Sequence, residues 1–248
     1  MPELPDLAIL ADALDVALSG RPLTGAKVAQ TLVLRGTPAE LAAFEGQQLL
    51  DITRRGKFLV FRFERDCMVF NPMLTGRLGV ATAGEKAWGQ WAAMFEFGAA
   101  TSKARRHTWP PTNAPWLPRR DLGVELRYRD ATRMGKIYLV PAGVARPIAG
   151  WDEQGPDADD PKLTLDIWRE RIGRHSGELK SLLRNQAFVA GIGNAYSDEI
   201  LWAARLAPFR KRASLAPDEV DALYLALRDT LPWAIGQLHE LVPPRLEV

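Results

Sequence analysis

The turn from Ala190 to Gly193 carries residue types whose spacing suits chemistry with an anion. It joins two segments with helical spacing, and its two glycines permit positive φ and bring backbone N–H groups to the surface. The first turn of the following helix adds further unpaired donors, and helix N-termini bind anions. The turn therefore predicts an anion site. A tight helix-helix connection, in which glycine only permits close packing, explains the same residues.

A second stretch combines cationic and aromatic side chains. Residues 101–120 hold two tryptophans, four prolines, no acidic residue and five basic residues: Lys103, Arg105, Arg106, Arg119 and Arg120. Because proline removes an amide donor and fixes φ, the segment is predicted to be a loop. Basic groups among indoles suit a phosphate backbone and unstacked bases. A surface loop whose tryptophans fold back onto the domain explains the composition equally well.

The sequence gives little support for a metal site or a disulfide bond. His107, His175 and His239 are scattered, and no carboxylate cluster has metal-ligand spacing. The single Cys67 excludes an intramolecular disulfide and a zinc site built from several cysteines within these residues. A metal-dependent hydrolase is therefore a weak hypothesis, and no motif indicates a nucleotide cofactor.

The elements that must position these groups change in character along the chain. Apolar residues from Leu7 to Leu18 recur at helical spacing and stop before Gly20, which predicts an amphipathic helix. Short β-type runs then follow at 57–63, 67–73, 91–97, 123–129 and 136–141, and they favour an antiparallel sandwich or barrel. Helical patterns occupy 163–173, 177–189, 194–206 and 216–231. We expect a β-rich domain followed by a helical one.

Charge and composition locate the boundary between these halves. The 248 residues are 47% hydrophobic and carry a net charge of +2, as expected for a soluble globular protein. Five acidic residues fall within 151–161, a Gly/Pro/Asp-rich stretch that we interpret as a linker. The predicted domains are therefore 1–150 and 162–248. No segment is long and apolar enough to cross a membrane, and no secretory signal begins the chain, so we expect a cytoplasmic protein.

Four motifs together resemble one known family. They are MPELPD at the start, RRGKFLVF at 54–61, DATRMG at 130–135 and LKSLLRNQAFVAGIGNAYSDEILWAARLAP at 179–208. In this order they are similar to the formamidopyrimidine-DNA glycosylase/endonuclease VIII family of base-excision repair enzymes. The resemblance implies an α+β fold, in which an N-terminal antiparallel β-sandwich with an N-terminal helix precedes a helical domain containing a helix-two-turns-helix element. It also implies that damaged double-stranded DNA binds between the domains.

The resemblance assigns catalytic roles to three residues. Pro2 would be the amine nucleophile once Met1 is removed, and an α-amino group with a pKa of about 7.7–8.0 is partly unprotonated at neutral pH. Glu3 resembles the family's general acid/base, and Lys57 matches a lysine that contacts the phosphate near the lesion. The implied function is removal of oxidised or ring-opened bases through a Schiff base on the N-terminal proline, with AP lyase activity.

Other matched positions imply contacts with DNA. Extruding a nucleotide leaves a hole in the base stack, and Leu74, Thr132 and Met134 stand where the family fills it. The commonest pattern has Met, Arg and Phe there, so Thr132 should weaken or alter the preference for the opposite base. Arg133 keeps the family's arginine and would bind phosphate.

The helical half contributes the remaining DNA-binding positions. Lys180 and Asn194 match phosphate-binding residues, and Asn194 would also cap the second helix of the element. Gly191 and Gly193 lie in the turn between the two helices of this element. Asn71 replaces the family's usual histidine at its position.

Two departures from the family concern whole segments. Residues 100–121 look like an insertion of about twenty residues, and most relatives continue into a C-terminal zinc finger or its zincless equivalent. We expect a truncated chain, with zinc present only if the native protein continues past Val248, and a monomer on the bacterial chromosome. The alternative to truncation is a divergent branch of the family that lacks the finger. The alternative function is a catalytically weak or inactive DNA-binding relative that recognises abasic or damaged DNA.

Overall fold

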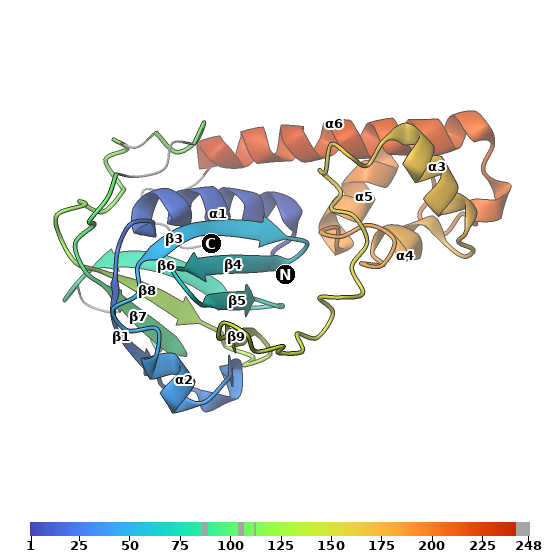
Figure 1. Ribbon diagram of the computed structural model, residues 1–248. Helices are drawn as coiled ribbons and strands as arrows, with labels where there is room; N and C mark the ends of the chain where they lie inside the picture. The colour runs from blue at the N-terminus through green and yellow to red at the C-terminus, as the bar shows by residue number, and fades with distance from the viewer. Residues whose placement is uncertain (86–88, 104–106, 112, 242–248) are drawn as a thin grey trace.

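The computed structural model describes residues 1–85, 89–103, 107–111 and 113–241. It comprises a β domain, formed by α1, α2 and all the strands, and a helical domain, formed by α3 to α6 (Figure 1). The elements of the β domain are α1 (Leu4–Leu18), β1 (Leu23–Val28), β2 (Leu34–Arg35), α2 (Pro38–Ala42), β3 (Leu49–Arg55), β4 (Phe58–Phe63), β5 (Cys67–Asn71), β6 (Arg77–Thr82), β7 (Ala93–Phe97), β8 (Val124–Arg129) and β9 (Lys136–Val140). Those of the helical domain are α3 (Leu165–Gly173), α4 (Leu179–Leu183), α5 (Asn194–Ala203) and α6 (Pro217–Leu241). The predicted α+β fold is confirmed.

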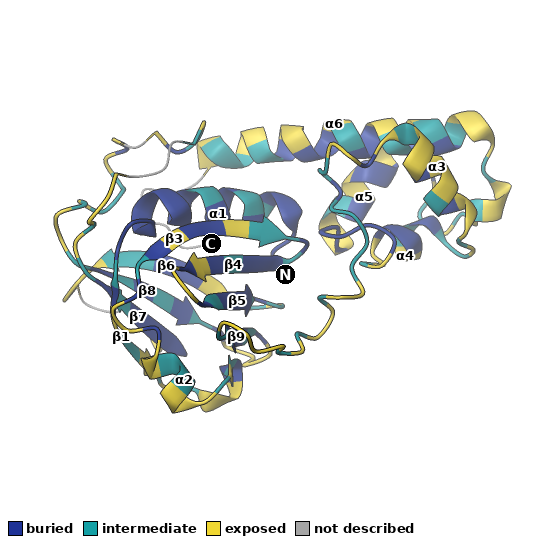
Figure 2. Cartoon of the chain, viewed as in Figure 1, coloured by how far each residue is buried: buried dark blue, intermediate teal, exposed yellow. Residues whose placement is uncertain are grey.

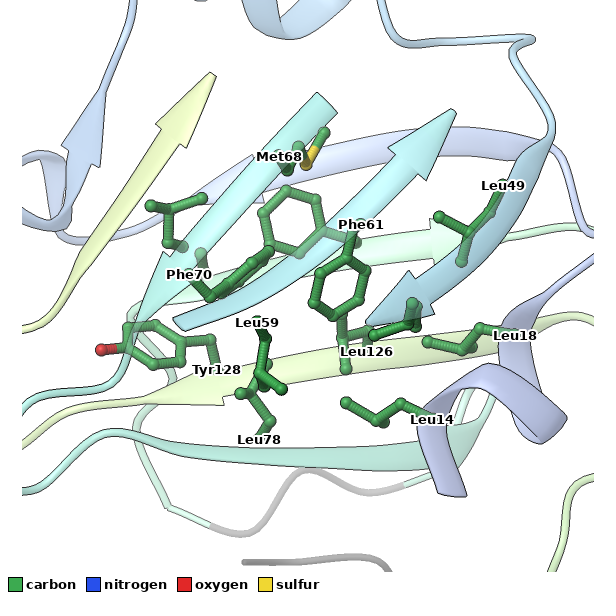
Figure 3. Packing of buried hydrophobic residues seen from close by; sticks show 14 of the residues in the cluster. Leu14, Leu18, Leu49, Leu59, Phe61, Met68, Phe70, Leu78, Leu126 and Tyr128 are labelled. Carbon is green, nitrogen blue, oxygen red and sulfur yellow. The ribbon is translucent and has the colours of Figure 1, made fainter. Parts of the chain in front are cut away.

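Two sheets build the β domain. One has the strand order β1-β7-β8-β6 and the other β2-β9-β5-β4-β3, and every pair is antiparallel except β2 with β9. Alternate residues of β4 face the core, so Phe61 and Phe63 are buried. Side chains from both sheets and from α1 meet in one core, where Leu14 and Leu18 lie beside Phe61 (Figure 3). This packing fixes α1, and with it the N-terminus of the chain.

The helical domain has a core of its own. Trp168 of α3 is fully buried and donates its Nε1–H to the carbonyl of Val220 at 3.2 Å. Leu4, the first residue of α1, joins this second core and not the first. Helix α1 thus begins in one domain and is buried in the other. Figure 2 shows the exposed face of α6 turned outward.

Two helices end at residues other than those predicted from the sequence. The helix predicted over 177–189 stops at Leu183, because Asn185 accepts the backbone N–H of Ala187 at 3.0 Å and stabilises a turn. The helix predicted over 216–231 continues through Pro232 to Leu241. Proline removes one backbone donor, and packing of α6 against α1 supports the continued helix. No helix in the described ranges is long and apolar enough to span a membrane.

Candidate functional site

A pocket of 730 Å³ opens between the two domains. The β domain contributes residues before and within its strands, and the helical domain contributes the segment that ends at the first turn of α5. Residues that line it from both sides include Met1, Glu3, Lys57, Leu74, Arg184 and Asn194. All of these except Leu74 lie in the four sequence motifs, although no motif assigns a role to Arg184.

Glu3 lies at the centre of the contact between the domains. Its carboxylate accepts backbone N–H groups from Gly193 at 2.6 Å, Ala195 at 2.9 Å and Tyr196 at 3.2 Å, and the residue is 3% exposed. These donors are the unpaired amides of the N-terminus of α5. The predicted anion site therefore exists, and the anion that fills it is the chain's own carboxylate.

Close packing also requires the two glycines of the turn. Gly191 has φ +100°, and a Cβ there would lie 2.8 Å from Leu4. A Cβ on Gly193 would lie 2.5 Å from the Glu3 carboxyl group and 2.8 Å from the Lys57 Nζ. The turn is thus both an anion site and a closely packed connection between helices, the two explanations that the sequence left open.

The capping role predicted for Asn194 is wrong. Gly193 occupies the N-cap position of α5 and Asn194 is the first helical residue. The Glu3 carboxylate satisfies the amides that a capping side chain would otherwise take. The side chain of Asn194 is exposed and lines the pocket.

Pro2 and Lys57 adjoin Glu3. Pro2 is buried, and Met1 lines the pocket. Lys57 follows Gly56, whose φ of +55° forms the turn between β3 and β4. Burial lowers the pKa of Lys57; the Glu3 charge opposes this shift and Arg184 adds to it. The structure therefore brings the three predicted catalytic residues together.

The acidic stretch after the β domain is not a free linker. Arg54 donates to Asp157 at 2.8 Å and to Asp159 at 2.6 Å, and Asp157 also accepts the Gly56 N–H at 2.7 Å. The Arg54 side chain is only 9% exposed. These contacts fix the turn that carries Lys57. Sequence reasoning missed them, although the two acidic residues and the RRG motif were both visible.

Two neighbouring loops present the predicted stack-filling residues. Leu74 and Met134 are 47% and 44% exposed. The Thr132 hydroxyl contacts that of Thr75 at 2.7 Å and donates to Asp130 at 3.1 Å, which ties the loops together. Of these residues only Leu74 lines the pocket.

Backbone conformation marks the same two loops. Met73 has φ 53° and Arg133 has φ 57°, values that cost energy for residues other than glycine. Each precedes one of the exposed apolar residues. Arg133 is exposed and is not part of the pocket.

Other predicted residues lie farther from Glu3. Lys180 pairs with Asp198 at 2.7 Å. In the described part of 101–120, Trp109 and Trp116 pack against the β core, as the folded-back alternative requires. Arg120 donates to the carbonyls of Val16 and Ser19. Arg105 and Arg106 lie outside the described residues.

The described residues do not fit a metal ion. No group of three or more His, Cys, Asp or Glu side chains within these ranges could hold one.

Comparison with known proteins relates this site to a family. Residues 1–137 match the formamidopyrimidine-DNA glycosylase N-terminal domain, and residues 154–240 match the formamidopyrimidine-DNA glycosylase H2TH domain. The chain belongs to the formamidopyrimidine-DNA glycosylase family. Its helical domain is therefore the family's H2TH domain, and the RRG and GIGN motifs lie within the matched domains.

Two similar relatives are identical to the chain at about a third of the aligned positions. The formamidopyrimidine-DNA glycosylase of Pelotomaculum thermopropionicum is 31% identical, over 93% of this chain and 76% of its own length. That of Symbiobacterium thermophilum is 33% identical, over 95% of this chain and 70% of its own length. The relatives are thus longer than this chain.

Solved structures share the fold. Lactococcus lactis Fpg in complex with DNA containing an abasic site matches with a TM-score of 0.78 at 21% identity, over 94% of this chain and 78% of that one. A complex of the same protein with DNA containing N7-benzyl-Fapy-dG matches with the same TM-score.

Proposed function

We propose that the protein is a DNA glycosylase with AP lyase activity that removes oxidised or ring-opened bases from double-stranded DNA. The observation that carries the proposal is that Glu3 and Lys57 line one pocket at the N-terminus of α5, with the buried Pro2 next to Glu3 in the chain. Membership of the glycosylase family and fold similarity to Fpg–DNA complexes support it.

The proposed nucleophile is the secondary amine of Pro2. It becomes free when Met1 is removed, because in the full chain the nitrogen belongs to a peptide bond. Its lone pair forms a bond to the sugar C1′, and the base departs with the electron pair of the glycosidic bond and takes up a proton. Opening of the sugar ring then leaves an iminium, which accepts electrons when a 2′ proton is lost and the 3′ phosphate is eliminated.

Glu3 is the proposed proton carrier. It adjoins Pro2 in sequence, and its position is fixed by three amide donors. In its acid form it protonates the ring oxygen as the sugar opens, and the carboxylate so formed takes the 2′ proton during elimination. Lys57, with Asn194 across the pocket, supplies donors for a phosphate beside the lesion.

Exposed residues at the edge of the pocket and beyond it are proposed to hold and deform the duplex. Leu74 and Met134 are exposed apolar groups that fill the vacated position in the base stack. Thr132 is short and already engaged with Asp130, so it reads the opposite base weakly. Arg133 and Lys180 add cations for the backbone.

Borohydride trapping tests the proposal. The purified protein is incubated with duplexes carrying an abasic site, and intact mass confirms removal of Met1. We expect a covalent adduct that maps to Pro2, since reduction of the iminium makes the bond permanent. Pro2→Gly retains an α-amine and should trap at a reduced rate. Absence of any adduct from a protein that lacks Met1 and binds the duplex would overturn the proposal.

One observation favours the alternative of a weakly catalytic DNA-binding relative. Three backbone amides at the N-terminus of α5 donate to the Glu3 carboxylate, and each of these hydrogen bonds uses a lone pair that a transferred proton would otherwise take. This alternative predicts tight binding to abasic DNA without trapping. The same experiment separates the two functions.

A further inference from the structure

A second contact between the domains lies away from the pocket. Helix α6 starts in the core of the helical domain, where Leu223 and Leu227 are fully buried. It then crosses above α1 toward the far end of the β domain (Figure 1). The end of α6 therefore lies over a domain other than the one that anchors its beginning.

His107 attaches residues 107–111 to α1. Its Nε2 lies 2.7 Å from the Asp15 carboxylate and its Nδ1 lies 3.2 Å from Asp12. Asp15 is completely buried and also accepts the backbone N–H of Ile52 at 2.8 Å. A buried carboxylate with these partners is a rigid attachment point.

Trp109, two residues later, reaches the other domain. Its ring stacks on His239 near the end of α6, with 4.7 Å between centroids and 18° between planes. Its ring also contacts that of Trp116, with 5.7 Å between centroids, and both tryptophans pack against the β core. The stacked pair thus connects Trp109, which packs against the β domain, to the last turn of α6 in the helical domain.

We propose that His107 and Trp109 form an interdomain strap that fixes the angle between the two domains. The strap acts at the opposite end of α1 from Glu3, so the domains are held at both ends of this helix. Restricting their rotation holds the N-terminus of α5 against Glu3 and Lys57 and thereby sets the width of the pocket. The strap consists of described residues only and does not depend on the proposed enzymatic activity.

Distance measurements by pulsed electron paramagnetic resonance test the strap. Spin labels are placed at Glu45→Cys and Asp166→Cys, both exposed, in a Cys67→Ser background of the full chain. The DNA-free protein should give one narrow distance distribution. In Trp109→Ala and in His239→Ala, a second population of molecules should have a different distance between the two labels. Relative to the unsubstituted background, this population should grow roughly two- to tenfold, the range expected for loss of one aromatic contact.

Three further variants test whether the effect comes from the contact between Trp109 and His239. Trp202→Ala removes a tryptophan that is 83% exposed in the helical domain, and it should leave the distribution unchanged. The double variant Trp109→Ala/His239→Ala should equal either single variant, since both remove the same contact. His239→Phe keeps a stacked ring and should restore the narrow distribution. Unchanged distributions in Trp109→Ala and His239→Ala, with thermal unfolding showing both folded, would overturn the strap.

Discussion

The Glu3 carboxylate of the β domain accepts the backbone N–H of Gly193 at 2.6 Å, across 190 positions of the sequence. One side chain thus performs two tasks. It satisfies the amides of the turn between α4 and α5, and it lies beside the residue proposed as nucleophile. Changes at either residue should therefore affect both the joining of the domains and the chemistry.

Glu3→Gln should abolish base excision and spare DNA binding. The amide keeps one acceptor oxygen, but the charge-assisted bonds to the N-terminus of α5 are lost, so we expect the free energy of unfolding to fall by about 1–3 kcal/mol. Excision assays, gel shifts and denaturant unfolding measure the three effects. Asp6→Asn, a carboxylate of the same helical turn that accepts the Glu3 N–H, is the control and should retain excision. Unchanged excision in Glu3→Gln would remove Glu3 from its proposed role.

Gly193→Ala should destabilise the protein. The added Cβ falls 2.5 Å from the Glu3 carboxyl group, so the turn and the carboxylate must separate, at a cost of about 1–3 kcal/mol. Gly236→Ala is the matched control, because its Cβ meets nothing within 4 Å inside α6. That substitution should stabilise by about 0.5–1 kcal/mol. Equal melting temperatures for the two variants would contradict the close contact.

Lys57→Met should make folding more stable at neutral pH while weakening the binding of abasic DNA. Burial lowers the pKa of Lys57 below its ordinary 10.5, so the unfolded chain holds this proton more tightly than the folded one. Stability of the native sequence therefore rises with pH between the lowered pKa and 10.5. The advantage of the variant should be constant below that window and shrink within it. Urea titrations at several pH values check this, and a pH-independent difference would argue against it.

Leu74→Ala combined with Met134→Ala should slow excision by about tenfold or more, since unstacking a base costs a few kcal/mol that these side chains help to offset. Both residues are about half exposed, so stability should change by less than about 0.5 kcal/mol. Leu225→Ala, which is 56% exposed on α6, provides the control. Single-turnover rates on a duplex with one lesion measure the effect. Rates equal to those of the control would show that the two loops do not enter the stack.

Local patterns predicted more of the fold than of the site's contacts. Periodicity located α1 and five of the strands, because each signal lies within one element. The motifs drew attention to Pro2, Glu3 and Lys57 through the family resemblance. The contact of Arg54 with Asp159 joins residues 105 positions apart, and no local pattern carries such information. The same reason explains why the acidic stretch looked like a solvated linker.

Two helices end at residues other than those predicted, and contacts outside the hydrophobic pattern explain both. Helix α4 is short because side chains of Asn185 and Gln186 bind the backbone of the turn, an arrangement that hydrophobic spacing does not reveal. Helix α6 is long because α1 supports its second half. Local side-chain hydrogen bonds shortened one helix, and a tertiary contact lengthened the other.

The burial of Leu4 in the helical core has a consequence for how the protein is made on the ribosome. Leu4 and its partner Gly191 are far apart in the chain, and at about 5–20 residues per second the ribosome needs roughly 10–40 s to synthesise the segment between them. Throughout that interval the first residues have no helical domain to pack against. The initiator methionine thus stays within reach of an aminopeptidase while the chain is nascent. We therefore expect removal of Met1, which the proposed Pro2 nucleophile requires, to precede the folding of the helical domain.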